Sequence, residues 1–267
     1  MRFATKINSG PGTVPLDGQG GVDTTTLQPY GDEDVRMIRR DYILRMIEEF
    51  CRGLARLRAY IEFEDWKQAS NALDGEFQKL IGLGAEAVVQ KSETELFANV
   101  IRGEATSAVA EKTLMLVRLL KEAGDVAVGE GRNNESHAYY LKGLHLLLDV
   151  IARGEALEFP EFVPQVEAFV LALRDIVLPV STQAKLMQHY EKSDQFARAE
   201  DALFAILDQE PDNPGVFDLG TEFYRRLERR TDRILEEGNL PRAELEAGLK
   251  ELQERKAALA AYSSPSK

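Results

Sequence analysis

Apolar residues recur at steps of three and four along most of the chain, and this pattern begins abruptly at Val35. Such spacing places a continuous apolar stripe on one side of a helix, so the sequence predicts a long amphipathic helix from Val35 to about Ile61. Hardly any segment alternates apolar and polar residues in steps of two, so no sheet is expected. The stripe of the first helix consists of Ile38, Tyr42, Ile43, Met46, Ile47, Phe50, Leu54, Leu57 and Ile61.

Start and stop residues divide the pattern into about ten helices in all. Gly82 and Gly84 end the second helix, and Ser92 with Glu95 forms a capping box that opens a short one. Pro179 ends a later helix. After the first helix, the predicted segments are 65–81, 93–102, 108–131, 134–154, 162–178, 181–192, 195–209, 216–237 and 239–262.

The two ends of the chain lack this periodicity. Residues 1–34 are rich in Gly, Pro, Thr and Asp, which bury too little apolar surface to offset the entropy of ordering. We therefore expect a disordered extension over 1–34, a helical domain over 35–262 and a flexible tail over 263–267. Met37 lies close to the first boundary, which gives the hypothesis that the native chain starts there. The intact mass of the native protein tests it.

A spacing of two rings, one small residue and one leucine occurs twice. In each copy a ring on one helix precedes a turn, a second ring opens the next helix, and the small residue lets two helices approach closely. Both sets are therefore predicted to pack paired helices together. The copies are Tyr60, Trp66, Ala69 and Leu73, and Tyr190, Phe196, Ala199 and Leu203 with a closing Pro211.

A third stretch between these copies resembles the signature of the tetratricopeptide repeat, a paired-helix unit. Its residues are Gly124, Gly131, Ser136, Tyr139, Tyr140 and Leu144. The resemblance implies an all-α solenoid of stacked helix pairs with a concave face. Ala69, Ser136 and Ala199 are 67 and 63 residues apart, nearly twice the usual period of about 34 residues. The expected fold is therefore an irregular, right-handed solenoid.

By the same resemblance, a groove on the concave face would hold a peptide or a partner helix. Some members of the superfamily grip a C-terminal carboxylate there with Lys and Asn. Arg118 and Lys121 are the matching cations in this chain, although the asparagine is missing. The groove candidates are Arg58, Arg118, Lys121, Asp125, Ala184 and Gln188.

The chain as a whole also resembles a functionally uncharacterised family of bacterial tetratricopeptide-like proteins. The resemblance covers about residues 37–260 and is carried by Met37–Phe50, Trp66–Leu83 and Leu119–Asp125. It implies no activity. It does imply that residues 1–36 are an extension that family members lack.

Composition narrows the classes of function. The formal net charge is −12, which repels nucleic acids and anionic membranes at long range, so neither is an expected partner. The single cysteine, Cys51, excludes an intramolecular disulfide and indicates a reducing compartment; its apolar surroundings predict burial. No apolar run reaches the roughly 18 residues of a membrane span, and the N-terminus lacks the apolar centre of a signal peptide. We therefore expect a cytoplasmic protein.

The residue types that carry catalysis are present but are not arranged for it. His137 and His145 are eight residues apart, which is not the four-residue spacing that clamps a metal on a helix. We interpret both, and His189, as surface or edge residues. Carboxylate pairs such as Glu48 and Glu49 are interpreted as solvated helix faces, and no Gly-x-Ser-x-Gly motif occurs. No catalytic residue, metal or cofactor is expected.

Two arginine stripes allow two interpretations. Ion pairing and solvation along a helix would explain them, and so would a strip that docks an acidic partner or nucleic acid. Few aromatic residues are interleaved for base stacking. The stripes are Arg45, Arg52 and Arg56, and Arg225, Arg226, Arg229, Arg230 and Arg233.

The favoured hypothesis is a non-enzymatic module that binds a protein or peptide in the groove. The alternative is a structural protein that self-associates through its C-terminal helix, and an enzyme of unrecognised type is third. In the second hypothesis the helix packs back as a cap or crosses to a second chain through Leu240, Leu245, Leu249, Leu252 and Leu259.

Overall fold

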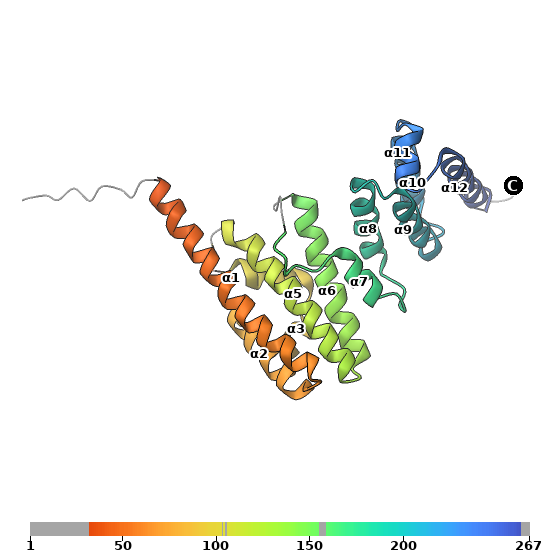
Figure 1. The fold of residues 1–267 in the computed structure, drawn as a ribbon. Coiled ribbons are helices and arrows are strands. Elements are labelled where there is room, and N and C mark those ends of the chain that lie inside the picture. The colour runs from red at the N-terminus through yellow and green to blue at the C-terminus, as the bar shows by residue number, and fades with distance from the viewer. Residues whose placement is uncertain (1–31, 103, 105, 155–158, 263–267) are drawn as a thin grey trace, which may run out of the picture. The chain divides into compact units, whose positions relative to one another are not determined.

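The computed structural model of the chain describes residues 32–102, 104, 106–154 and 159–262. Over these ranges it has twelve helices and no strand (Figure 1), so the all-α prediction is confirmed. The helices are α1 (Asp32–Glu62), α2 (Trp66–Ile81), α3 (Ala85–Gln90), α4 (Glu93–Ile101), α5 (Thr106–Gly129), α6 (Asn133–Arg153), α7 (Val166–Ala172), α8 (Val180–Lys192), α9 (Phe196–Gln209), α10 (Pro214–Glu228), α11 (Asp232–Glu237) and α12 (Arg242–Tyr262).

The chain divides into two units, Met1–Asp41 and Tyr42–Lys267. In the first unit the described residues are the start of α1, from Asp32. This helix begins three residues before the predicted Val35, because apolar spacing marks the buried stripe of a helix and not its end. The predicted disorder of 1–31 and flexibility of 263–267 concern residues outside the described ranges.

In the second unit, three helix pairs share one kind of turn. The pairs α1/α2, α5/α6 and α8/α9 are each joined by three residues. The middle residue of each turn has a positive φ, and the last N–H donates to a carbonyl five residues earlier, which is a Schellman arrangement. The donors and acceptors are Asp65 and Tyr60 (2.9 Å), Arg132 and Ala127 (2.7 Å), and Gln195 and Tyr190 (2.8 Å); the positive-φ residues are Glu64, Gly131 and Asp194.

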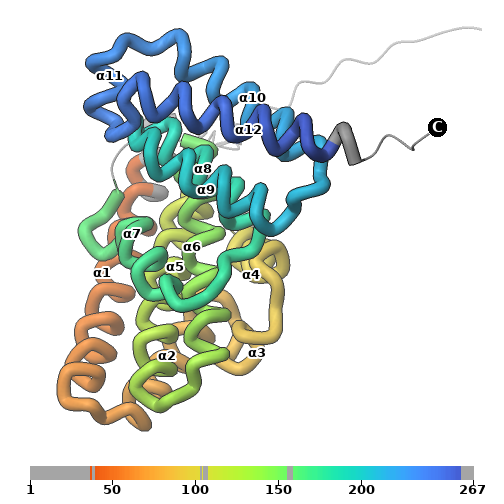
Figure 2. Tube along the Cα trace, turned by 90° about the vertical axis from the view of Figure 1, so that its right-hand side faces the viewer, coloured from red at the N-terminus to blue at the C-terminus, as the bar shows by residue number. Residues whose placement is uncertain are grey.

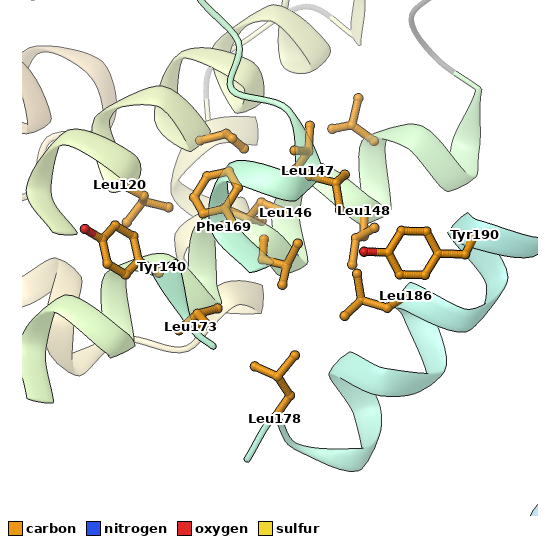
Figure 3. Packing of buried hydrophobic residues seen from close by; sticks show 14 of the residues in the cluster. Leu120, Tyr140, Leu146, Leu147, Leu148, Phe169, Leu173, Leu178, Leu186 and Tyr190 are labelled. Atoms are coloured by element: carbon orange, nitrogen blue, oxygen red, sulfur yellow. The ribbon is translucent and has the colours of Figure 1, made fainter. Parts of the chain in front are cut away.

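Each pair packs against the next one along the chain. α2 contacts α5, α6 contacts α8, and α9 contacts α10, which in turn contacts α12 (Figures 1 and 2). α7 packs on α6, and Figure 3 shows its Phe169 ring within the buried apolar cluster. Gly143 makes room for that ring, because a Cβ at this position would lie 2.6 Å from Phe169 Cε1.

The small residues that the repeat comparison singled out, Ala69, Ser136 and Ala199, are all buried. The rings beside two of them lie against glycines further along the chain: Trp66 against Gly129, the last residue of α5, and Phe196 against Gly238, which follows α11. Of the remaining packing candidates, Leu73, Leu203, Tyr190 and Tyr140 are buried, Tyr60 is half-buried, Gly124 lies against the Tyr140 ring, Gly131 is the positive-φ turn residue, and Pro211 is exposed.

The segment 216–237, predicted as one helix, is two helices, and this prediction is wrong. α10 ends at Glu228 and α11 begins at Asp232. Arg242, at the start of α12, donates from Nη2 to the Arg230 carbonyl (2.7 Å) and from Nη1 to the Glu228 carbonyl (3.3 Å). A guanidinium therefore binds carbonyls that a continuous helix would use for its own hydrogen bonds.

Two other boundaries differ from the prediction. Residues 85–90, which lie between two predicted helices, form the additional helix α3. The segment 162–178 is helical only over α7. After α7, the β-branched Ile176 and Val177 approach Pro179, and both features disfavour a helix there.

The predicted burial of Cys51 is wrong, because this residue is exposed. The buried stripe of α1 passes through Phe50, Leu54 and Leu57. One residue along a helix turns the side chain by about 100°, so Cys51 lies off the stripe that Phe50 occupies.

The capping box that opens α4 is confirmed. Ser92 Oγ accepts from the Glu95 N–H at 3.3 Å, and the Glu95 carboxylate accepts from the Ser92 N–H at 2.9 Å. In the described ranges, no helix has both the length and the apolar character that crossing a bilayer requires.

Candidate partner-binding site

One surface hollow of about 600 Å³ contains four of the six predicted groove residues, Arg58, Arg118, Lys121 and Asp125. Ala184 and Gln188 lie on α8 and do not line it. We call it the α1–α5 hollow. Its lining is Arg58, Ile61, Glu62, Arg118, Lys121, Glu122, Asp125, Pro164 and Ala168.

The three cations of the α1–α5 hollow already have partners within the chain. Arg118 pairs with Glu122, and Lys121 Nζ lies 2.6 Å from Asp125 Oδ1. Arg58 Nε approaches Glu122 Oε1 at 3.6 Å. Both pairs on α5 have a spacing of four residues, which places opposite charges side by side on one helix face. These ion pairs compete with the carboxylate grip that the resemblance implied for Arg118 and Lys121.

The same network continues into the core. Tyr140 donates its hydroxyl to Asp125 Oδ1 at 2.7 Å, and burial together with that carboxylate raises the pKa of Tyr140. Glu122 is only 3% exposed. The charged side chains of the α1–α5 hollow therefore hold α5 to its neighbours, and little of their charge is free for a ligand.

A second hollow, of about 710 Å³, opens between α1 and α2 beside α5. We call it the α1–α2 hollow. Apolar residues from all three helices line part of it, and five charged residues line the rest. The apolar part is Met46, Phe50, Leu80 and Met115; the charged part is Glu49, Arg52, Arg56, Glu76 and Lys79.

A close approach of two helices organises the charged part. Glu76, on α2, is buried against Gly53 of α1, where a Cβ would lie 2.5 Å from Glu76 Cδ. The missing side chain therefore lets the carboxylate lie beside the α1 backbone. From there Glu76 binds Lys79 Nζ at 2.7 Å and approaches Arg56 Nη2 at 3.8 Å.

The charges of the α1–α2 hollow do not cancel. Three cations face two carboxylates, a net charge of +1, and Arg56 and Lys79 share the Glu76 carboxylate. Arg52 Nε donates to the Glu48 carbonyl at 3.4 Å, and among the described residues it forms no ion pair with a carboxylate. The side chains of Arg56 and Lys79 are 70% and 65% exposed, so their charges face solvent.

Sequence reasoning reached this hollow only in part. Arg52 and Arg56 belong to the first arginine stripe, while Arg45 of that stripe is exposed and does not line the hollow. Lys79, Glu76 and the apolar lining were missed. A glycine in the interior of a helix, Gly53, was the available signal of a close approach.

The second arginine stripe is largely paired, which favours ion pairing over docking. Arg225 binds Glu222 at 2.8 Å, Arg226 binds Glu191 at 2.6 Å, and Arg233 binds Glu237 at 3.2 Å.

His145, interpreted from the sequence as a surface or edge residue, is partly buried. Its Nε2 lies 2.5 Å from Thr182 Oγ1 and its Nδ1 lies 3.8 Å from Glu93 Oε1. Burial and the nearby Lys185 lower the pKa of His145. The order of groups resembles that of a catalytic triad, but Thr182 is fully buried and has no surface to offer a substrate. This cluster joins α4, α6 and α8.

The other histidines give no second site. His189 is half-buried beside Tyr190, and burial lowers the pKa of His189. His137 is partly exposed. No group of His, Cys, Asp and Glu in the described ranges could hold a metal ion.

The C-terminal leucines are mostly covered within the chain. Leu240, Leu245 and Leu252 are buried, and Leu252 fills the space beside Gly220 of α10. Leu249 and Leu259 are partly buried. Within the chain, α12 packs on α10 and α11 (Figure 2).

Comparison with known proteins gives one relationship. No curated protein and no solved structure matches the chain significantly. One protein-family model matches residues 37–257, which is most of the chain. The chain therefore belongs to the family of unknown function DUF6483.

Proposed function

We propose that this chain is a non-enzymatic interaction protein that holds a peptide or helix of a partner protein in the α1–α2 hollow. The observation that carries the proposal is the combination in that hollow of an apolar lining with cations that the chain leaves partly unpaired. Binding sites for peptides commonly join an apolar floor to a few polar groups that fix orientation.

The proposal includes a tetratricopeptide-like, irregular solenoid as the scaffold. Three features support it: helix pairs that pack in chain order, a common three-residue turn, and buried small residues at Ala69, Ser136 and Ala199. The exposed, single cysteine favours a reducing compartment such as the cytoplasm.

Selection of helical peptides from a random display library on the full chain tests this function. We expect the selected peptides to bind the Met46→Gln variant more weakly, because this change removes apolar contact at nearly constant size. The same peptides should bind the Arg118→Ala and Lys121→Ala variants as well as they bind the unmodified chain. Circular dichroism checks that each variant is folded. Peptides that bind the Met46→Gln chain unchanged, or that need Arg118 and Lys121, would overturn the assignment to this hollow.

A further inference from the structure

The net charge of the lining of the α1–α2 hollow is opposite in sign to the net charge of the chain. The chain carries −12, whereas the lining of this hollow carries +1. Charges further away than about 8 Å are largely screened at physiological salt, so a short ligand in the hollow is governed by the cations it touches. An extended polyanion, such as nucleic acid or a membrane surface, would also meet the acidic surroundings.

The positions of the cations indicate the form of the ligand. Arg52 and Arg56 are four residues apart on α1, so they lie on one face, one turn from each other. Lys79 faces the same hollow from α2. A helix with carboxylates at the same four-residue spacing would bring two negative charges to Arg52 and Arg56 along one side.

The apolar lining indicates what lies between those carboxylates. Met46 contributes a partly exposed, flexible and polarisable side chain that adapts to ligands of different shape, whereas Met115 is fully buried beneath the hollow. Phe50 and Leu80 add rigid apolar surface. An aliphatic side chain on the partner helix would bury against Met46 and the exposed edges of Phe50 and Leu80, while its neighbouring carboxylates stay at the charged rim.

We propose that the α1–α2 hollow binds an acidic amphipathic helix of a partner protein, with an aliphatic residue flanked by carboxylates four residues apart. This inference rests on the proposed function and specifies its partner. Arg52 contributes most to the preference for acidic ligands, because it is the rim cation without an ion pair to a described carboxylate. Arg56 and Lys79 contribute less because they share Glu76.

Fluorescence anisotropy with labelled synthetic helices of about 18 residues tests the inference. Four alanine-rich peptides are compared. Three of them contain Leu flanked by two residues at the four-residue spacing, which are Glu in the first peptide, Gln in the second and Lys in the third. The fourth peptide contains the two Glu residues without Leu. We expect the Glu and Leu probe to bind the full chain tightest. Arg52→Glu should weaken it about tenfold at low salt, and Met46→Gln should weaken it as well.

Two comparisons keep the test specific. Arg229→Glu makes the same charge change at an exposed position outside the hollow and should leave binding unchanged. The Arg52→Glu chain should bind the Lys and Leu probe better than the unmodified chain does, since the charge pattern is reversed on both sides.

The outcomes separate the two proposals. Equal binding of the Glu, Gln and Lys probes, still weakened by Met46→Gln, overturns the acidic partner and leaves the proposed function standing. The absence of any Met46-dependent peptide binding overturns both. Binding of an oligonucleotide or of phosphatidylglycerol vesicles in preference to all peptides, and lost in Arg52→Glu, also overturns the acidic helix and identifies a polyanion site.

Discussion

The two hollows are built from the same kinds of residue but use their charges differently. In the α1–α5 hollow, Arg118 and Lys121 each have a carboxylate four residues further along the same helix, so each is neutralised locally. In the α1–α2 hollow, Lys79 and Arg56 converge on Glu76, which is on the same helix as Lys79 and on the neighbouring helix from Arg56, and Arg52 has no carboxylate partner among the described residues. The ion pairs that form in the folded chain therefore separate a structural network from a surface with charge to offer, because Arg52 also has carboxylates four and three residues earlier, Glu48 and Glu49, and pairs with neither.

Removing one carboxylate from each hollow should give the largest difference in stability between the two hollows. Glu122→Ala leaves the enclosed Arg118 without its partner, and we expect a loss of about 3 kcal/mol in the free energy of unfolding. Glu76→Ala leaves cations that already face solvent, so we expect at most about 1 kcal/mol. Urea denaturation followed by circular dichroism measures both.

A control on the first pair separates the charge from the packing. Arg118→Met combined with Glu122→Leu removes both charges at similar volume and should cost less than Glu122→Ala alone. Equal losses for Glu122→Ala and Glu76→Ala would show that the two networks are equally structural.

Alanine substitutions at one glycine beside each hollow should show the same difference between the two hollows, with a smaller effect on stability. A Cβ at Gly124 would overlap the Tyr140 ring, which is buried and hydrogen-bonded to Asp125, so Gly124→Ala should cost about 2 kcal/mol. A Cβ at Gly53 meets the end of a flexible carboxylate. The gain of roughly 0.5–1 kcal/mol from alanine in a helix offsets that displacement, so Gly53→Ala should stay within about 1 kcal/mol of the unmodified chain.

The same denaturation experiment checks this pair, and acidic-probe binding to Gly53→Ala adds a second measurement. If Gly53→Ala is as destabilising as Gly124→Ala, Glu76 is held as firmly as Tyr140 and the α1–α2 rim is not adaptable.

The His145 cluster gives a third test, in which the enclosed titratable group is a histidine and not an arginine pair. We expect its effect on the free energy of unfolding to be the smallest of the three. Burial and Lys185 lower the pKa of His145 in the folded chain, with Glu93 and Asp149 opposing them. The unfolded chain therefore binds more protons just below its pKa of about 6.5. The stability that His145 contributes is complete above that pH and is lost as the pH falls through the lower folded pKa.

Unfolding free energies at several pH values between about 7.5 and 5 check this sign. His145→Gln should reduce the loss of stability on acidification, with His137→Gln as the control on the same helix. A steeper loss in His145→Gln than in the unmodified chain would contradict it.

Local patterns predicted the local features of the fold. The three- and four-residue spacing located most helices, and the capping box at Ser92 and Glu95 formed as expected because both partners lie within one turn. The break between α10 and α11 was missed because it depends on Arg242, whose guanidinium reaches back to the carbonyls of Glu228 and Arg230. A contact of this kind leaves no periodic signal.

The same division applies to the site. Arg118 and Glu122, and Lys121 and Asp125, have the four-residue spacing of helical ion pairs, although Glu48 and Arg52 share that spacing without pairing. The meeting of Gly53 and Glu76 joins two helices and follows from how α1 and α2 pack. The tetratricopeptide resemblance led to the hollow whose cations are neutralised, and only the first arginine stripe pointed toward the other one.

The three-residue turns also restrict how the chain can change in length. Because the residue after each turn begins the next helix, the turn alone sets the rotation of that helix about its axis. One inserted residue would rotate α2 or α9 by about 100° and carry Ala69 or Ala199 out of its helix contact. Insertions and deletions are therefore expected to be rejected at residues 63–65 and 193–195, even though these turns lie among exposed residues.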